Sequence, residues 1–346
     1  LSSGNWTKGA LARNGIPQSK NSDRDTGVVG FHVYEQAGTY TATLNVGGAT
    51  ASTQITVTSP DSQWSGTNTV CVYTTTVPTP GVTPGCPAGA AVLQATGANP
   101  LSDAILSDCS GSKRCLFARG ETYSSSSGIT IPVGLKYFGA YGTGPKPIWQ
   151  DAAAGSQNSF IGFADNTSDF QFVDLDVRGK VDVVNSPSGT AFNASNTTVI
   201  NRALWLRVDI SRFDVALYMH CNNAPACNLE ADDVHHEIAF IDSTAQYGPG
   251  AQANTSGLAN IYITAKFFAM AGSISGNDLA GTITTNGVSG SSFDARIKWM
   301  QKGYIAHNDW GLLNPGADPM GVAAEVIGCG HEYESGTATI GPRGGG

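Results

Sequence analysis

Alternating apolar and polar residues recur along this chain and predict short β-strands. In "FVDLDVRG" (Phe172–Gly179) and "LRVDISRF" (Leu206–Phe213), apolar residues occupy alternate positions around the central aspartate. A period of two is typical of a strand with one buried face. The two segments align with Asp176 opposite Asp209, which is a spacing of 33 residues.

A second pair of similar segments lies further along the chain. "SISGNDL" (Ser273–Leu279) resembles "YIAHNDW" (Tyr304–Trp310), at a spacing of 31 residues. Repeats of roughly 20–50 residues indicate stacked units that cannot bury their apolar faces alone. We therefore expect each unit to form one coil of a β-solenoid, with strands of successive coils about 4.8 Å apart.

Two further phrases carry a likeness to a known architecture. "LFARGETY" (Leu116–Tyr123), followed by "GLKYFGAYGTGPKPIW" (Gly134–Trp149), resembles the first coils of right-handed parallel β-helices of the pectate-lyase-like group. The resemblance covers about residues 95–340. It implies that Asn277 and Asn308 take the same turn position in successive coils and form an asparagine ladder. Residues 95–113 are expected to cap the N-terminal end, because an open end would expose strand edges.

The first 60 residues have a different strand pattern. "FHVYEQAGTYTATLNV" (Phe31–Val46) and "STQITVTSP" (Ser52–Pro60) hold alternating β-formers around Gly38. They resemble the C-terminal half of a PKD domain, an immunoglobulin-like β-sandwich, which implies a spacer or contact module. We predict an all-β chain with this sandwich at 1–60, a Pro/Gly/Thr-rich linker at 61–94, and a right-handed parallel β-helix at 95–346.

The low content of charged residues and the negative net charge bear on which partners the chain can bind. Charged residues make up 13% of the 346 residues, and the net charge is −8. This balance argues against nucleic acid, which requires a basic surface. No run of about 20 apolar residues exists, so we expect no membrane span. The modest acidity permits cation binding without requiring it.

The cysteines predict short disulfide loops. Three close pairs are expected to form disulfides: Cys71–Cys86, Cys109–Cys115 and Cys221–Cys227. Disulfides indicate an oxidising compartment, and we therefore expect a secreted, extracellular protein. Cys329 is left over, and it either pairs outside this chain or remains a buried thiol. The chain has no initiator methionine and reads as a piece of something longer.

The polar faces of the two aspartate-containing strands carry the strongest candidate chemistry. Stacked carboxylates repel each other unless a cation separates them, so Asp174, Asp176 and Asp209 are candidate calcium ligands. The pectate-lyase-like resemblance implies a calcium-assisted lyase in which Arg178, Arg207 or Arg212 removes a proton; Lys180 is a further candidate. The alternative is a ladder of surface ion pairs, each worth at most about 1 kcal/mol.

Other candidates are weaker. Trp205, Trp299 and Trp310 are candidates for stacking on sugar rings, with core packing as the alternative. "EADDVHHE" (Glu230–Glu237) offers carboxylates and two histidines for metal binding or acid–base chemistry. In a strand, however, adjacent histidines point to opposite faces, which favours a hydrated loop instead. His307 is a candidate base or a turn residue.

Two functions remain open at this point. The first is a non-enzymatic extracellular surface protein: an adhesin, matrix component or assembly subunit that contacts polysaccharide or other copies of itself. The second is a polysaccharide-active enzyme, a calcium-dependent lyase by preference and a related hydrolase or epimerase otherwise. The sequence requires no cofactor, and calcium is the one candidate that it offers. The PKD likeness points to a prokaryotic source.

Overall fold

The computed structural model describes residues 30–105, 109, 113–132, 137–153, 159–164, 167–180, 188–195, 200–220, 235–247, 259–275, 293–298, 302–305, 309–310 and 322–327. Within these ranges the chain is all-β, as predicted. Its strands, in chain order, are β1 (Gly38–Val46), β2 (Ala49–Val57), β3 (Thr69–Tyr73), β4 (Ala91–Gln94), β5 (Arg114–Ala118), β6 (Thr122–Ser125), β7 (Ile129–Ile131), β8 (Tyr137–Tyr141), β9 (Ile148–Asp151), β10 (Ser159–Phe163), β11 (Thr167–Val173), β12 (Asp176–Arg178), β13 (Ser188–Ser195), β14 (Ile200–Leu206), β15 (Asp209–His220), β16 (His235–Tyr247), β17 (Ala259–Ser275), β18 (Phe293–Lys298), β19 (Lys302–Ile305), β20 (Asp309–Trp310) and β21 (Val322–Ile327). The described helical turns are α1 (Pro60–Gln63), the 3-10 turn η3 (Gly66–Asn68) and α2 (Pro100–Asp103). None of these described helices has the length and apolar character needed to cross a membrane.

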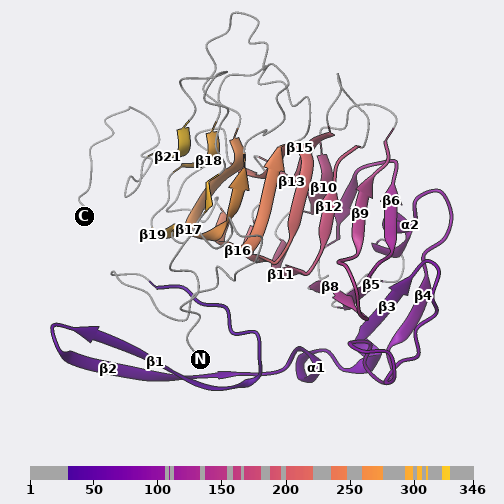
Figure 1. Ribbon diagram of the computed structural model, residues 1–346, viewed down its shortest axis with the longest axis horizontal. Helices are drawn as coiled ribbons and strands as arrows, with labels where there is room; N and C mark the ends of the chain where they lie inside the picture. Colours follow the sequence, from indigo (N-terminus) through magenta and orange to yellow (C-terminus); the bar gives the residue numbers. More distant parts are fainter. Residues whose placement is uncertain are drawn as a thin grey trace, which may run out of the picture.

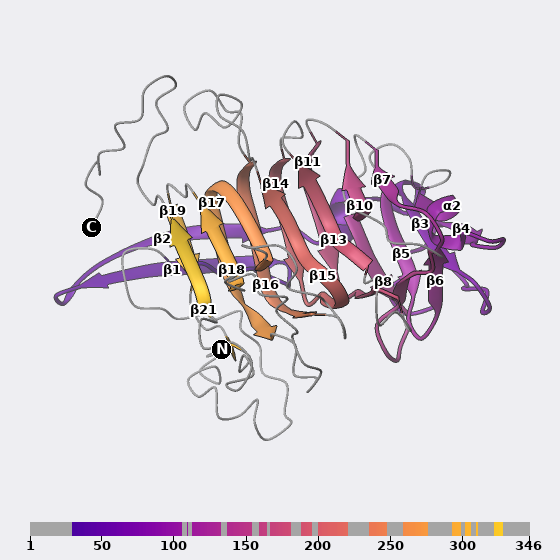
Figure 2. The same ribbon diagram turned by 90° about the horizontal axis from the view of Figure 1, so that it is seen from above.

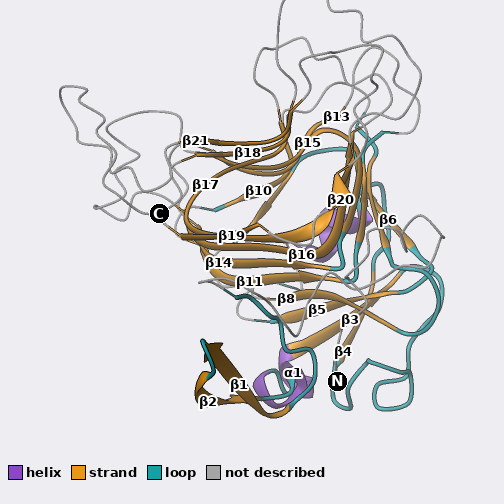
Figure 3. Ribbon diagram, turned by 60° about the vertical axis from the view of Figure 1, so that its left-hand side comes forward, coloured by secondary structure: helices purple, strands orange, loops and turns teal. Residues whose placement is uncertain are grey.

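Parallel pairing joins most strands into three stacks along the body (Figure 1). Stack 1 contains β4, β3, β5, β8, β11, β14, the first part of β16, the middle of β17, and β19. Stack 2 contains β6, β9, β12, the start of β15, the second part of β16, the end of β17, and β20. Stack 3 contains β7, β10, β13, the rest of β15, the start of β17, β18 and β21. Figure 3 shows the stacks on separate sides of the interior, an arrangement consistent with a β-solenoid.

The solenoid core is a column of large apolar side chains in register. In stack 1, matching inward positions are taken successively by Cys115, Phe138, Phe172, Trp205, Phe240, Met270 and Ile305. The rings of Phe138 and Phe172 are stacked with centroids 5.0 Å apart, and those of Phe172 and Trp205 are stacked at 5.5 Å. Each coil therefore packs its inward residue on the equivalent residue of the coil below, which is what a solenoid requires for a continuous core.

The parallel sheet begins earlier than the boundary predicted at residue 95. Strand β3 is buried throughout and pairs with both β4 and β5, so part of the segment expected to be a linker belongs to the solenoid. The predicted disulfide Cys71–Cys86 is present and ties the following loop to β3. The predicted disulfide Cys109–Cys115 is also present; Cys221, Cys227 and Cys329 lie outside the described residues.

Residues around α2 close the N-terminal end of the core. Leu101, Ala104 and Ile105 are buried in the main apolar cluster, together with the disulfide half Cys109. Apolar side chains over the first coil replace the contacts that a preceding coil would otherwise make. The described part of the predicted cap, residues 95–105 and 109, thus contributes buried side chains to the main core.

A buried carboxylate fixes the loop that follows β3. Glu121 accepts hydrogen bonds from the Thr74 hydroxyl (2.9 Å), the Thr75 hydroxyl (2.7 Å) and the Thr76 amide (2.9 Å). Burial alone would raise the pKa of Glu121, but the hydrogen bonds from the three threonines outweigh it and lower the pKa below its usual value. The carboxylate is therefore held ionised, as the acceptor on which the loop closes.

We expect Glu121→Gln to lower the free energy of unfolding by about 1–3 kcal/mol, because the amide group cannot accept from all of these donors. Urea unfolding at neutral pH measures the change. The matched control is Glu237→Gln on the exposed side of β16, where we expect a change within about 0.5 kcal/mol. Equal effects of the two substitutions would contradict this role for Glu121.

The N-terminal segment forms a hairpin and not, within the described residues, a sandwich. Strands β1 and β2 pair antiparallel from Gly38–Val57 to Val46–Ala49, and no third described strand joins them. The hairpin runs alongside the body and its turn projects beyond it (Figures 1 and 2). The predicted strands at this point are present, whereas an immunoglobulin-like sandwich is not shown.

The residues before the hairpin, 31–35, form what we call the strap. They lie on the outer face of stack 1, where Phe31 and Val33 pack against a buried apolar cluster made up of Val173, Leu206, Ala239, Ile241, Ala269, Ala271 and Tyr304. The Phe31 ring lies 6.0 Å from the Phe267 ring and 6.1 Å from the Tyr304 ring. Stack 1 is therefore apolar on both of its faces.

The strand register agrees with one of the two repeat alignments predicted from the sequence and contradicts the other. The structure pairs Asp176 with Asp209, which confirms the 33-residue alignment. Tyr304, however, lies beside Ala269, and Ser273 lies beside Asp309, so the alignment of Ser273 with Tyr304 is wrong. The predicted ladder residues Asn277 and Asn308 lie outside the described residues. Coil lengths vary along the chain, and a similar phrase therefore does not guarantee an equivalent position.

Candidate functional site

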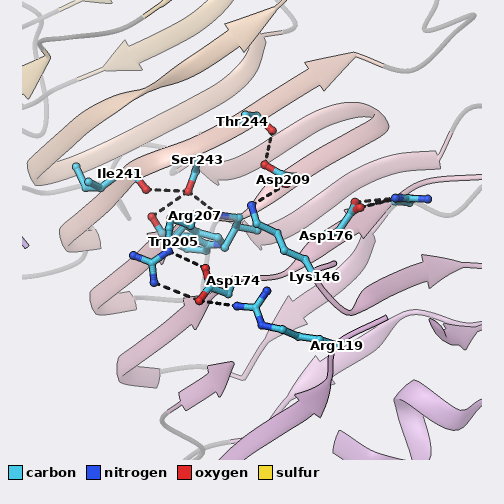
Figure 4. Close-up of polar contacts among 12 residues, drawn as sticks. Arg119, Lys146, Asp174, Asp176, Trp205, Arg207, Asp209, Ile241, Ser243 and Thr244 are labelled. Atoms are coloured by element: carbon cyan, nitrogen blue, oxygen red, sulfur yellow. Dashed lines mark hydrogen bonds and ion pairs between the residues drawn. The ribbon is translucent and has the colours of Figure 1, made fainter. Parts of the chain in front are cut away.

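The candidate site is a charged strip on the outside of the solenoid. It follows the corner between stacks 1 and 2 and continues over the outer face of stack 2 (Figure 4). The corner is a column of residues with left-handed backbone: Gly142, Asp174, Arg207 and Asp242, with φ of 85°, 57°, 52° and 51°. Such a conformation allows the sharp bend between two strands, and it is uncommon for residues other than glycine, asparagine and aspartate. It turns the side chains of Asp174 and Arg207 out along the same edge.

Asp174 lies between two arginines: Arg207 comes from the next coil, and Arg119 comes from two coils earlier. Its Oδ2 atom is 3.0 Å from Nη2 of Arg119, and its Oδ1 atom accepts from Nε of Arg207 at 2.6 Å. Nη2 of Arg207 adds a second bond to Oδ2 at 3.2 Å. Arg207 also forms an ion pair with Glu35 at the end of the strap. The corner therefore carries alternating charges, and it links the strap to the solenoid.

Asp176 and Asp209, which lie side by side in the register, each have their own cation. Both carboxylate oxygens of Asp176 accept from Nε of Arg178 at 3.0 Å, within the same strand. Oδ2 of Asp209 is 2.7 Å from Nζ of Lys146, and Oδ1 accepts from the Thr244 hydroxyl at 2.9 Å. The cations remove the repulsion that would otherwise oppose stacking of two carboxylates.

Four carboxylates of the strip are thus each paired with a cation. The four acids Asp174, Asp176, Asp209 and Glu35 are matched by Arg119, Lys146, Arg178 and Arg207. No group of three or more His, Cys, Asp or Glu residues in the described part of the chain is arranged to hold a metal ion. For calcium to bind the predicted ligands Asp174, Asp176 and Asp209, the arginine and lysine side chains would first have to leave.

The environment of two candidate bases, Arg207 and Arg178, favours their protonated form. Burial acts against the charge of Arg207, but the hydrogen bond to Asp174, its charge and that of Glu35 outweigh burial and raise the pKa. The hydrogen bond to Asp176 likewise raises the pKa of Arg178. An arginine is an efficient base only when its pKa is lowered toward the working pH. Arg212 is half-buried at the next corner, with φ of 65°, and Lys180 is buried.

Of the three candidate sugar-binding tryptophans, the structure places the side chain of one, Trp205. Trp205 is fully buried in the core column, so its ring is not available to a ligand in this conformation. Trp310 is the last residue of β20, and its side chain lies outside the described part of the chain. Trp299 lies outside the described residues, as does His307.

The two histidines lie in strand β16 and not in the hydrated loop that the sequence favoured, so that interpretation is wrong for His235 and His236. His235 is buried, and its Nδ1 atom accepts from the Ile200 amide at 3.1 Å, while His236 is half-buried. The preceding residues Glu230–Val234 lie outside the described part of the chain. His235 therefore connects the backbone of neighbouring coils rather than facing a ligand.

Sequence reasoning did not identify three members of the strip: Arg119, Lys146 and Glu35. Arg119 and Lys146 come from loops after β5 and before β9, and Glu35 comes from a segment 172 residues away from its partner Arg207. The alternating pattern that revealed Asp176 and Asp209 exists only within strands. The one available signal was the presence of positive charges in loops two coils before the aspartates.

Comparison with known proteins gave no further assignment. No protein-family model, curated protein or solved structure matches the chain significantly. The function must therefore be argued from the geometry above.

Proposed function

We propose that this chain is a non-enzymatic structural protein of the extracellular surface, in which the solenoid is a rigid body for adhesion or assembly. The observation that carries this proposal is the charged strip. The carboxylates of Asp174, Asp176 and Asp209 are paired with arginine or lysine, so the strip links coils along its edge and leaves none of these three carboxylates poised for proton transfer. Cross-strand ion pairs of this kind contribute modestly and mainly fix the register.

Two further features support an extracellular setting. The disulfides Cys71–Cys86 and Cys109–Cys115 both lie at the N-terminal end of the solenoid, and such bonds persist in oxidising compartments. The surface is weakly charged and the chain is acidic overall, which suits contact with neutral or polar partners better than with nucleic acid. A prokaryotic, secreted origin and a PKD-like role for the hairpin remain part of the proposal.

The second candidate is a calcium-dependent lyase of the pectate-lyase-like type. It is favoured by the parallel solenoid and by the register of Asp176 beside Asp209. A shared architecture by itself does not establish activity. This candidate requires that calcium and a uronate displace the arginine and lysine partners of the strip.

The test is an assay of the whole chain on polyuronates, with and without calcium. We expect binding at most, and no unsaturated product absorbing in the ultraviolet. We also expect Asp176→Ala and Asp209→Ala to change the free energy of unfolding by about 1 kcal/mol or less, as for exposed ion pairs. The matched control is Asp169→Ala, which removes the partner of the exposed Arg202 on β14, away from the strip.

Calcium-dependent turnover would contradict this proposal if it is lost in Asp176→Ala and Asp209→Ala but kept in Asp169→Ala. All three variants should retain the wild-type circular dichroism, so that loss of activity is not loss of fold.

A further inference from the structure

The first strands of the solenoid lie in a long segment without charge. Between Asp61 and Asp103 the sequence contains no lysine, arginine, aspartate, glutamate or histidine, although 13% of the whole chain is charged. We call residues 62–102 the neutral segment. It contains β3, β4 and the loop between them, and Figures 1 and 2 place β4 at the end of the body opposite β21.

The neutral segment exposes apolar side chains on a well-fixed backbone. Val77, Val82 and Val92 are 65%, 76% and 39% exposed. The disulfide Cys71–Cys86 closes the loop, and the Gly81 amide donates to the Cys86 carbonyl at 2.9 Å. Exposed apolar groups on a fixed, uncharged surface are typical of an interaction site, because little ordering entropy opposes binding.

Strand β4 adds an open sheet edge to this surface. Among the described strands it pairs only with β3. The Ala95 amide donates to the Tyr73 carbonyl at 2.7 Å, so alternate residues of β4 face β3. By the same alternation, the backbone amides and carbonyls of Val92 and Gln94 point to the open side. The edge carries no charged residue, although charge is the usual protection of an exposed edge against pairing.

We infer that two copies of this chain associate head to head through β4, extending stack 1 across a two-fold axis. In this arrangement Val92 pairs antiparallel with Gln94 of the second copy, and Gln94 pairs with Val92 of the second copy. The outward backbone amides and carbonyls of both residues are then hydrogen-bonded in both copies. A two-fold interface uses the same patch on both partners and therefore closes at a dimer. This inference rests on the proposed assembly function and names its partner.

The charge distribution favours a second copy as the occupant. Two chains of net charge −8 repel each other, and the repulsion is smallest where neither surface carries charge. The neutral segment is the longest uncharged stretch of the described body, and it coincides with the open edge. A self-complementary contact along β4 therefore places no charged side chain of the neutral segment against its copy, whereas the same contact at the charged strip would bring like charges together.

The experiment is sedimentation velocity of the whole chain from about 1 to 100 μM, a range that detects micromolar association. The two test variants are Val92→Asp, which places a charge beside the two-fold axis, and Gln94→Pro, which removes an outward amide without touching the β3 pairing. The control is Val46→Asp at the exposed tip of the hairpin. Thermal unfolding of each variant checks that the solenoid is intact.

We expect a reversible dimer for the wild type and for Val46→Asp, and dissociation constants raised about tenfold or more in both test variants. A monomer at every concentration, an open-ended series of larger species, or a dimer unaffected by Val92→Asp and Gln94→Pro would overturn the inference. Failure of the dimer inference can be told apart from failure of the proposed function. A protein that stays monomeric and forms no unsaturated product from polyuronates would contradict the dimer but not the non-enzymatic function.

Discussion

Trp205→Ala is expected to lower the free energy of unfolding by about 3–5 kcal/mol, the range for large aromatic residues removed from a packed core. The side chain is fully buried, and its ring lies 5.5 Å from the rings of both Phe172 and Phe192. Its removal leaves a cavity in the middle of the aromatic column, where the neighbouring coils are held by their own hydrogen bonds and cannot close over it. Urea unfolding followed by far-ultraviolet circular dichroism measures the loss.

The control is Leu44→Ala, an apolar truncation at a site that is 58% exposed, where we expect a change within about 0.5 kcal/mol. The result also decides between the two roles considered for Trp205. If Trp205→Ala unfolds like the wild type but loses binding to polysaccharide, the residue is a sugar platform and its placement in the core is wrong.

Acidification from pH 6.5 to pH 4 is expected to remove about 3 kcal/mol of stability through His235 alone, since each pKa unit corresponds to about 1.4 kcal/mol. Burial lowers the pKa of His235 from 6.5 to about 4; a hydrogen bond with the Ala194 backbone opposes this shift, and the charge of His236 adds to it. Between these two pH values the unfolded chain binds a proton that the folded chain does not. Stability is therefore full above pH 6.5 and falls as the pH drops toward 4.

The hydrogen bond from the Ile200 amide also favours the neutral form of His235, because Nδ1 can accept this bond only while Nδ1 carries no proton. The measurement is the urea midpoint as a function of pH for the wild type and for His235→Gln. The variant is expected to be less stable at neutral pH but to lose less stability between pH 6.5 and 4. Parallel curves for the two proteins would show that His235 is not the source of the pH dependence.

The sequence pattern predicted stack 2 well because that stack has one buried and one solvated face. Its strands alternate, so Asp176 and Asp209 could be assigned to the outer face and aligned at the correct spacing. The same reasoning identified the strands of the N-terminal hairpin and two disulfides, since these depend on residues close together in the chain.

Stack 1 was harder because alternation fails where both faces are apolar. Three apolar residues follow one another at Leu204, Trp205 and Leu206. Trp205 points into the core, whereas Leu204 and Leu206 lie on the outer face, in the apolar cluster against which the strap packs. Without alternation, the direction of the Trp205 ring cannot be read from the sequence. The variable length of the coils had a similar effect at Ser273 and Tyr304, which resemble each other in context but lie in different positions of their coils.

The partners in the charged strip could not be predicted for a third reason. Asp174 and Arg207 occupy a corner whose left-handed backbone is set by the bend and not by residue type, and Glu35 reaches them from the far end of the chain. Pairwise contacts of this kind depend on how loops fold back, which no local pattern encodes. The sequence therefore predicted which aspartates and arginines lie on a polar surface, but not the oppositely charged side chains that pair with them.

The strap has a consequence for how the molecule loses its structure. In a linear array each coil contacts only its neighbours, so the terminal coils can fray one at a time. Residues 31–35 contact side chains from Arg207 in one coil to Tyr304 three coils further on, and thus couple units that do not otherwise touch. We expect this tether to make melting of the C-terminal coils more cooperative, and its removal to separate a single transition into successive steps.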